Sequence, residues 1–161
     1  MDSFHSAFLV FFLFYTTSEA GKYSSSTGRT TECDDCAAGK YYSTSGATSC
    51  FSCLAGTYSA SGSASCTACS VGFYTASTGS FSCSACSAGT FASSQGQTAC
   101  DDCSAGTYEA STASSSCSSC PLGQVQPATG QALCQACETG KFQSETGQMS
   151  CSNCAVGQFQ G

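Results

Sequence analysis

The sequence predicts a small disulfide-rich fold, mostly irregular with short β-hairpins and drawn out into an elongated tandem-repeat rod. Cysteines make up 16 of 161 residues and fall into regularly spaced C-x-x-C pairs. Glycine and a single aromatic residue recur at fixed places between the pairs, while charged residues account for only 9% of the chain. Because few Leu, Ile or Val remain to form a core, covalent cross-links must replace the burial that normally offsets chain entropy.

The first twenty residues differ from the rest and predict a signal peptide, residues 1–20. Residues 7–15 form a continuous apolar run, which at nine residues is too short for a membrane-spanning helix of about 20. Small residues then precede Ala20, as a signal peptidase requires, and we expect cleavage after Ala20. The segment before the apolar run carries Asp2 and His5 but no Lys or Arg, which is unusual for such a peptide.

Removal of this segment changes what the remaining chain, residues 21–161, can do. Ten acidic residues become eight without Asp2 and Glu19, so against four basic residues the net charge goes from −6 to −4. The single histidine, His5, is lost as well. No basic patch remains to attract nucleic acid, and no later stretch is apolar enough to span a membrane.

Internal repetition dominates the remaining sequence. Successive cysteine pairs begin 17 residues apart, except for one step of 16 from Cys50 to Cys66. The eight pairs are Cys33/Cys36, Cys50/Cys53, Cys66/Cys69, Cys83/Cys86, Cys100/Cys103, Cys117/Cys120, Cys134/Cys137 and Cys151/Cys154. We expect all of these cysteines to form structural disulfides, since a secreted chain matures in an oxidising compartment.

Each pair is followed by glycine, any residue and an aromatic residue, as in Gly89-Thr90-Phe91; the seventh unit has Val125 in the aromatic position. A second glycine lies four residues before most of the following pairs, with Ala113 in its place once. A partial copy begins at Gly21, next to the predicted cleavage site. A ninth, incomplete copy begins at Gly157.

One unit predicts one short hairpin. The first glycine suits a left-handed or tight-turn backbone, and the aromatic with its neighbours, such as residues 58–60, favours a short strand. The second glycine lies in a turn, and the three residues that return to cysteine are expected to form the second strand. Such a hairpin is unstable alone, so neighbouring units must stack. No helical periodicity remains after residue 20.

Sequence alone leaves the disulfide connectivity open. Closing each C-x-x-C pair on itself would give very small rings. Joining Cys36 to Cys50, and so on along the chain, would close loops of about 15 residues, each contributing roughly 3 kcal/mol. We favour a third scheme, Cys33 with Cys50 and Cys36 with Cys53, which gives modules with two bridges each.

Other chemistry is less well supported. Paired C-x-x-C motifs can hold zinc, and a thiolate zinc-binding protein is the alternative function, although the mature chain offers no histidine ligand. A redox C-x-x-C motif needs a helix N-terminus or basic neighbours to lower a thiol pKa, and neither is expected here. Nucleophilic catalysis lacks a general base, so we predict no enzyme and no cofactor.

Two further features have a structural and a binding interpretation. The acidic doublets Asp34-Asp35 and Asp101-Asp102 could contribute to a weak calcium site, but solvated acidic turns are the preferred interpretation. The aromatic residues could form a ligand-binding stripe along the rod, but packing against the disulfides is preferred.

The unit C-x-x-C-x-x-G-x-[YF] resembles the ephrin-receptor-like cysteine-rich repeat of the growth-factor-receptor cysteine-rich superfamily. Tumour necrosis factor receptor modules are a more distant likeness. Cys86-Ser87-Ala88-Gly89-Thr90-Phe91 and the stretch from Cys103 to Tyr108 carry the resemblance most clearly, and it covers essentially all of residues 21–161.

The resemblance implies a secreted or extracellular spacer or interaction array, at the cell surface if the chain is a fragment of a longer anchored protein. The partner would be an extracellular protein or glycan, whose identity the repeat does not specify. Nothing in the sequence resembles an ephrin-binding domain or a kinase.

Overall fold

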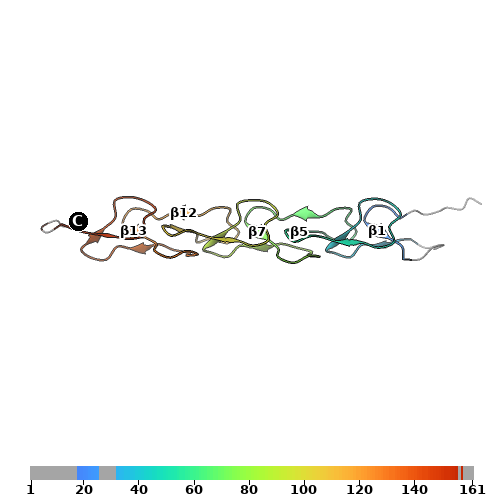
Figure 1. Cartoon of the computed structure of the whole chain (residues 1–161), viewed down its shortest axis with the longest axis horizontal. Helices are drawn as coiled ribbons and strands as arrows, with labels where there is room; N and C mark the ends of the chain where they lie inside the picture. The colour runs from blue at the N-terminus through green and yellow to red at the C-terminus, as the bar shows by residue number, and fades with distance from the viewer. Residues whose placement is uncertain (1–17, 26–31, 156, 158–161) are drawn as a thin grey trace, which may run out of the picture.

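The structure, a computed structural model, describes residues 18–25, 32–155 and 157, and it forms an elongated rod (Figure 1). Among these residues the regular elements are two-residue strands, and no helix occurs. The predicted class, a disulfide-rich rod of short hairpins, is therefore confirmed. The strands are β1 (Lys22–Tyr23), β2 (Asp34–Asp35), β3 (Lys40–Tyr41), β4 (Phe51–Ser52), β5 (Thr57–Tyr58), β6 (Thr67–Ala68), β7 (Phe73–Tyr74), β8 (Ser84–Ala85), β9 (Thr90–Phe91), β10 (Asp101–Asp102), β11 (Thr107–Tyr108), β12 (Ser118–Ser119), β13 (Gln124–Val125), β14 (Gln135–Ala136), β15 (Lys141–Phe142) and β16 (Ser152–Asn153).

Each odd-numbered strand pairs antiparallel with the next even-numbered strand, giving a series of separate hairpins. In the hairpin of β5 and β6, Tyr58 lies opposite Thr67. The second strand is therefore the dipeptide between two cysteines, and the expected strand in the three residues before the cysteine pair is wrong. That segment instead pairs with the hairpin of the preceding repeat. Ser80 forms a parallel bridge with Tyr58, and the Ser80 carbonyl accepts a hydrogen bond from Ser59 N at 3.3 Å.

The disulfides join the second cysteine of one pair to the first cysteine of the next. The two-bridge scheme, with Cys33 bonded to Cys50 and Cys36 to Cys53, is therefore wrong. The antiparallel return of each hairpin brings Cys50 to a Cα–Cα distance of 5.7 Å from Cys36, whereas Cys53 begins the next hairpin. The bonds are Cys36–Cys50, Cys53–Cys66, Cys69–Cys83, Cys86–Cys100, Cys103–Cys117, Cys120–Cys134 and Cys137–Cys151.

A natural repeat thus runs from the second cysteine of one pair to the dipeptide inside the next pair, for example 36–52. Backbone hydrogen bonds join each repeat to the one that follows. Gly39 N donates to Ser59 O and Gly62 N donates to Cys36 O, both at 2.8 Å. Equivalent bonds recur along the rod, so adjacent repeats form a continuous structure rather than independent modules.

Glycine allows each repeat to contact the second repeat after it as well. Gly89 has φ +84°, and a Cβ atom there would lie 2.2 Å from the carbonyl oxygen of Gly130. Corresponding close approaches join Gly39 to Gly79 and Gly72 to Ala113. Ala113, which occupies a glycine position, is held at φ 60°. Only a residue without a side chain fits the first position of these contacts.

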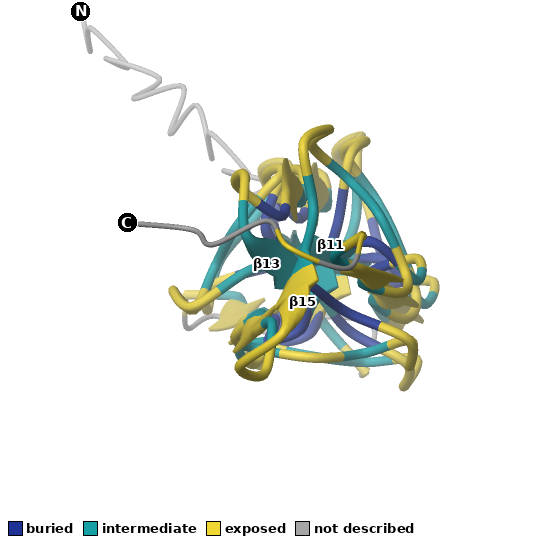
Figure 2. Cartoon of the chain, turned by 90° about the vertical axis from the view of Figure 1, so that its left-hand side faces the viewer, coloured by how far each residue is buried: buried dark blue, intermediate teal, exposed yellow. Residues whose placement is uncertain are grey.

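The buried residues are mainly cysteines and small side chains. In the end view of the rod they appear as dark blue stretches between exposed yellow loops, at several places around the central strands (Figure 2). The completely buried cysteines are Cys36, Cys53, Cys69, Cys86, Cys103 and Cys120. Buried polar side chains bond the backbone: Ser59 Oγ donates to Lys40 O at 3.0 Å, and Gln126 Nε2 donates to Leu133 O at 2.6 Å. Disulfides and backbone bonds therefore take the place of a large apolar interior.

The first repeat lacks a disulfide because serine occupies a cysteine position. Ser18 stands three residues before Gly21, just as Cys36 stands three residues before Gly39. Ser18 is buried, and its carbonyl and hydroxyl oxygens accept bonds from Gly46 N at 2.8 and 3.0 Å. Cys33 is consequently a free thiol, contrary to the expectation that every cysteine is bonded.

At the other end, Cys154 is also a free thiol. It is the second cysteine of its pair, and no further pair follows in this sequence. Of the predicted signal peptide, residues 1–17 lie outside the described residues, whereas Ser18 to Ala20 belong to the first repeat.

Candidate interaction surface

The cysteines have a structural role in this fold, because fourteen of them are paired in seven bonds. A sulphur atom in a disulfide is not the thiolate that zinc requires. The two free thiols, Cys33 and Cys154, belong to the first and last pairs of the chain. The donor set therefore does not fit the alternative function of a thiolate zinc-binding protein.

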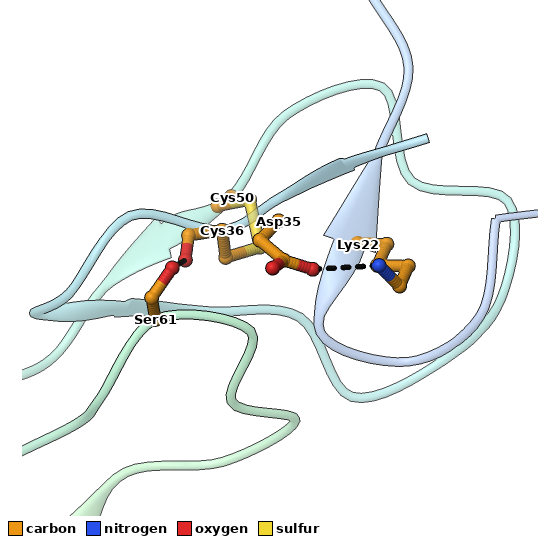
Figure 3. Close-up of polar contacts among 5 residues, drawn as sticks. All are labelled: Lys22, Asp35, Cys36, Cys50 and Ser61. Carbon is orange, nitrogen blue, oxygen red and sulfur yellow. Dashed lines mark hydrogen bonds and ion pairs between the residues drawn. A yellow bond between two sulfur atoms is a disulfide. The ribbon is translucent and has the colours of Figure 1, made fainter. Parts of the chain in front are cut away.

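The acidic doublets lie on exposed strands of different hairpins, Asp34-Asp35 in β2 and Asp101-Asp102 in β10. Lys22 Nζ approaches Asp35 Oδ1 at 2.7 Å (Figure 3). This hydrogen bond, together with the charge of Asp35, raises the pKa of Lys22. Across the described part of the chain, no group of three or more His, Cys, Asp or Glu side chains could hold a metal ion.

Figure 3 also shows how the same hairpin is joined to its neighbour. The Cys36–Cys50 disulfide lies beside Asp35, and Ser61 Oγ of the next repeat donates to Cys36 O at 3.2 Å. The backbone at each buried cysteine is thus held by the following repeat. Charged side chains next to a buried cysteine, such as Asp35 beside Cys36, lie at the surface.

Glu109 makes a local contact of its own on the surface. Its Oε1 atom accepts a hydrogen bond from the backbone N–H of Ser111 at 2.8 Å. Because this bond favours the charged carboxylate, it lowers the pKa of Glu109. The carboxylate therefore helps to fix the loop between β11 and β12.

In every described hairpin except that of β13 and β14, an aromatic residue occupies the second position of the first strand and is half-buried. Among them are Tyr58, Phe91 and Tyr108, in β5, β9 and β11. Val125 takes the same position in β13 and is 7% exposed. A hollow of about 190 Å³ lies beside Val125 and is lined by Gln135, Ala136, Glu138, Lys141 and Cys151.

A second surface feature is an aromatic cluster on the hairpin of β3 and β4. The rings of Tyr42 and Phe51 stack with centroids 5.5 Å apart, and Tyr41 lies tilted at 6.2 Å from Phe51. Phe51 is 60% exposed, and the other hairpins carry Asp, Thr, Ser or Gln at the same position. Sequence analysis missed this cluster, although comparison of the dipeptides inside the cysteine pairs would have singled out Phe51.

Other large apolar side chains are also exposed at scattered positions along the rod: Leu54, Val71, Phe81, Leu122, Leu133 and Met149. They fall just after the second cysteine of a pair, as Leu54, Val71 and Leu122 do, or just before the first cysteine of a pair, as Phe81, Leu133 and Met149 do. When exposed apolar side chains gather into a contiguous patch, the patch is typical of a surface that contacts another protein. No helix among the described residues has the length and apolarity needed to cross a membrane.

Fold and surface together define a class of protein, the extracellular-type cysteine-rich repeat array. The model of the family described as tyrosine-protein kinase ephrin type A/B receptor-like matches residues 56–96, 89–130 and 125–161. These matches span more than half of the chain and overlap along consecutive hairpins. The chain therefore belongs to the ephrin-receptor-like repeat family, which confirms the resemblance carried by the repeat motif.

Repeats of this family are a non-catalytic type of module. The family thus supports an extracellular interaction module, without specifying a partner. No curated protein matches the chain.

Proposed function

We propose that this protein is a secreted or cell-surface rod that acts as a spacer and presents side chains to an extracellular protein partner. The observation that carries the proposal is the composition of the interior of the rod. Cysteine, glycine and backbone hydrogen bonds form its interior, so side chains such as Phe51 and Leu54 are not needed for the core. They are available for recognition on a rigid support.

The disulfide ladder and the apolar leader support export from the cell. Seven disulfides persist where the surroundings are oxidising. Cleavage after Ala20 would remove Ser18 and its contacts with Gly46. It would leave Gly21 N bonded to Tyr42 O and Gly21 O bonded to Cys36 N, both at 2.8 Å, so the first hairpin would stay attached.

Expression in a secretory cell line tests export and processing together. We expect the protein in the medium, with Gly21 as its first residue and with Cys33 and Cys154 as the reactive thiols. A variant whose leader residues Leu9, Val10 and Phe11 are replaced by Asp serves as the control and should remain inside the cell. Recovery of the unaltered chain only inside the cell, with reduced cysteines, would contradict the proposal.

A binding screen tests the interaction role. The secreted rod, displayed in multivalent form, is applied to panels of extracellular proteins and of glycans. We expect a protein partner whose binding weakens in Phe51→Ser, because exposed aromatic residues often dominate interface energies. Binding confined to glycans would contradict a protein partner. The Ser111→Ala variant provides a surface control whose binding should be unchanged.

A further inference from the structure

Exposed large apolar side chains are concentrated in two repeats of the rod. The repeat of β7 and β8 carries Val71 and Phe81, which are 45% and 70% exposed. The repeat of β13 and β14 carries Leu122 and Leu133, which are 62% and 67% exposed. Among the described residues, no other repeat carries more than one such side chain. Each of the four lies within two residues of the disulfide of its own repeat.

These two repeats lie on the same side of the rod. In the view along the rod, the strands β11, β13 and β15 of consecutive repeats point in different directions around the axis (Figure 2). In the side view, β1, β7 and β13, which are three repeats apart, lie at corresponding places of successive turns (Figure 1). Leu122 accordingly follows Val71 by 51 residues, three repeats of 17. The four side chains therefore recur on one side of the rod, one turn apart, and we call them the apolar face.

The two repeats of the apolar face also carry no charge. Neither residues 69–85 nor residues 120–136 include Asp, Glu, Lys or Arg. The repeats between them contain Asp101, Asp102 and Glu109, but these repeats point in other directions around the axis. On this side of the rod only the first repeat, that of β1 and β2, is charged. The uncharged stretch thus runs from β7 to β14 and coincides with the apolar face.

The charge of the whole chain bears on what can cover this face. The chain is acidic, with a net charge of −6, so two copies repel each other wherever their charged sides meet. The apolar face avoids this repulsion, because it brings no carboxylates together. A second copy also presents the same two pairs of apolar side chains at the same spacing of one turn. Its spacing therefore matches both pairs at once.

We propose that the apolar face is the surface through which two copies of this chain associate side by side. A two-fold contact of this kind buries the same surface on both copies. Burial of Phe81 and Leu133 against apolar side chains of the second copy removes them from water. This association goes beyond the proposed function, because it needs no other protein and does not use the aromatic cluster at Phe51.

Sedimentation velocity of the oxidised full chain tests the proposal, with Cys33 and Cys154 blocked so that no disulfide forms between copies. We expect a reversible dimer whose fraction rises with protein concentration. Dimer affinity should not fall between about 50 mM and about 500 mM NaCl, because screening weakens attraction between charges and not apolar contacts. Monomer alone at every concentration up to about 1 mM, or an affinity that falls as salt is added, would overturn the proposal.

Substitutions on the apolar face give a second readout. Phe81→Ser and Leu133→Ser should each weaken the dimer at least about tenfold, because each removes apolar area from both copies. Leu54→Ser is the matched control and should leave the affinity unchanged. Leu54 is 73% exposed and belongs to an uncharged repeat that lies on another side of the rod. All three side chains are exposed, so the variants should keep the same disulfides, which peptide mapping checks.

Two results with these variants would overturn the proposal. One is a dimer whose affinity is the same in Phe81→Ser, Leu133→Ser and the unaltered chain. The other is a monomeric chain that binds a different protein through Phe81, since the apolar face would then belong to another partner. Both results are distinguishable from failure of the proposed function, because export and the effect of Phe51→Ser are measured separately.

Discussion

At the scale of single residues, glycine determines how closely the repeats can approach one another. Gly89 and Gly123 have similar backbone conformations, with φ +84° and +74°. A Cβ at Gly89 would meet the Gly130 carbonyl at 2.2 Å, whereas a Cβ at Gly123 would meet no atom within 4 Å. The pair therefore separates the cost of the backbone conformation from the cost of the close approach.

We predict that Gly123→Ala lowers the free energy of unfolding by about 1–2 kcal/mol, the cost of placing alanine in a left-handed conformation. Gly89→Ala should lower it by at least about 2 kcal/mol more, since the backbone of Gly130 cannot move aside cheaply. Denaturant unfolding of the oxidised proteins measures both. Equal losses would show that contact with the second following repeat contributes little.

Ala113 provides the converse change. It occupies a second-glycine position with φ 60°, and its carbonyl faces Gly72. We predict that Ala113→Gly raises the free energy of unfolding by about 0.5–1 kcal/mol, because release of the left-handed strain exceeds the added chain entropy. Thermal unfolding should show a higher midpoint. A lower midpoint would mean that the backbone at Ala113 is not strained.

Glu109 connects local structure to pH. The Ser111 N–H bond lowers its pKa in the folded state, so its stabilising contribution is present above the unfolded pKa and is lost as pH falls through the folded pKa. We predict that the Glu109 carboxyl titrates below an ordinary glutamate in NMR experiments. Titration at the ordinary value would show that the Ser111 contact does not form in solution.

At the scale of the element, one hairpin with one disulfide is the repeating piece. The disulfide closes the hairpin on itself, and each two-residue strand pair is too short to be stable without it. Cysteine spacing alone could not reveal this arrangement. The three pairing schemes all satisfy it, and the choice depends on the antiparallel return that places Cys100 beside Cys86.

We predict that the double variant Cys86→Ser/Cys100→Ser loses about 3 kcal/mol of stability, the value expected for a bridge that closes a loop of this length. Serine is a suitable replacement because Ser18 occupies the equivalent position in the first repeat. Hydrogen exchange should show faster exchange in the hairpin of β9 and β10 and in its neighbours.

Cys33→Ser is the matched control for that experiment. Cys33 is a free thiol, so its replacement should leave both stability and exchange unchanged. A loss similar to that of the double variant would mean that Cys33 is bonded in the folded protein.

At the scale of the whole molecule, the rod is continuous because repeats contact both the next repeat and the second one after it, as Gly39 contacts Ser59 and Gly79. The sequence predicted the tandem repeats, the absence of helices after residue 20 and the role of the first glycine. It could not predict that the segment before a cysteine pair lies against the hairpin of the preceding repeat, as Ser80 bridges Tyr58. No local sequence signal distinguishes this pairing from a strand within the segment's own hairpin.

The first repeat carries its own sequence signal for the missing disulfide. Ser18-x-x-Gly21 matches Cys36-x-x-Gly39, which would have identified Ser18 as the residue in the buried cysteine position and Cys33 as its unpaired counterpart. The hollow beside Val125 has no such signal, because its charged lining, Glu138 and Lys141, comes from the neighbouring repeat. Side chains from different repeats meet only through the three-dimensional stacking.

The most direct test of the continuous ladder is peptide mapping without reduction, after thiols are blocked and the protein is cleaved by chymotrypsin at its aromatic residues. The structure bonds Cys86 to Cys100, so the peptides that end at Phe91 and Tyr108 should stay joined until reduction. Blocked thiols should be found at Cys33 and Cys154. Separation of those two peptides before reduction, with Cys86 bonded to Cys69 instead, would contradict the account.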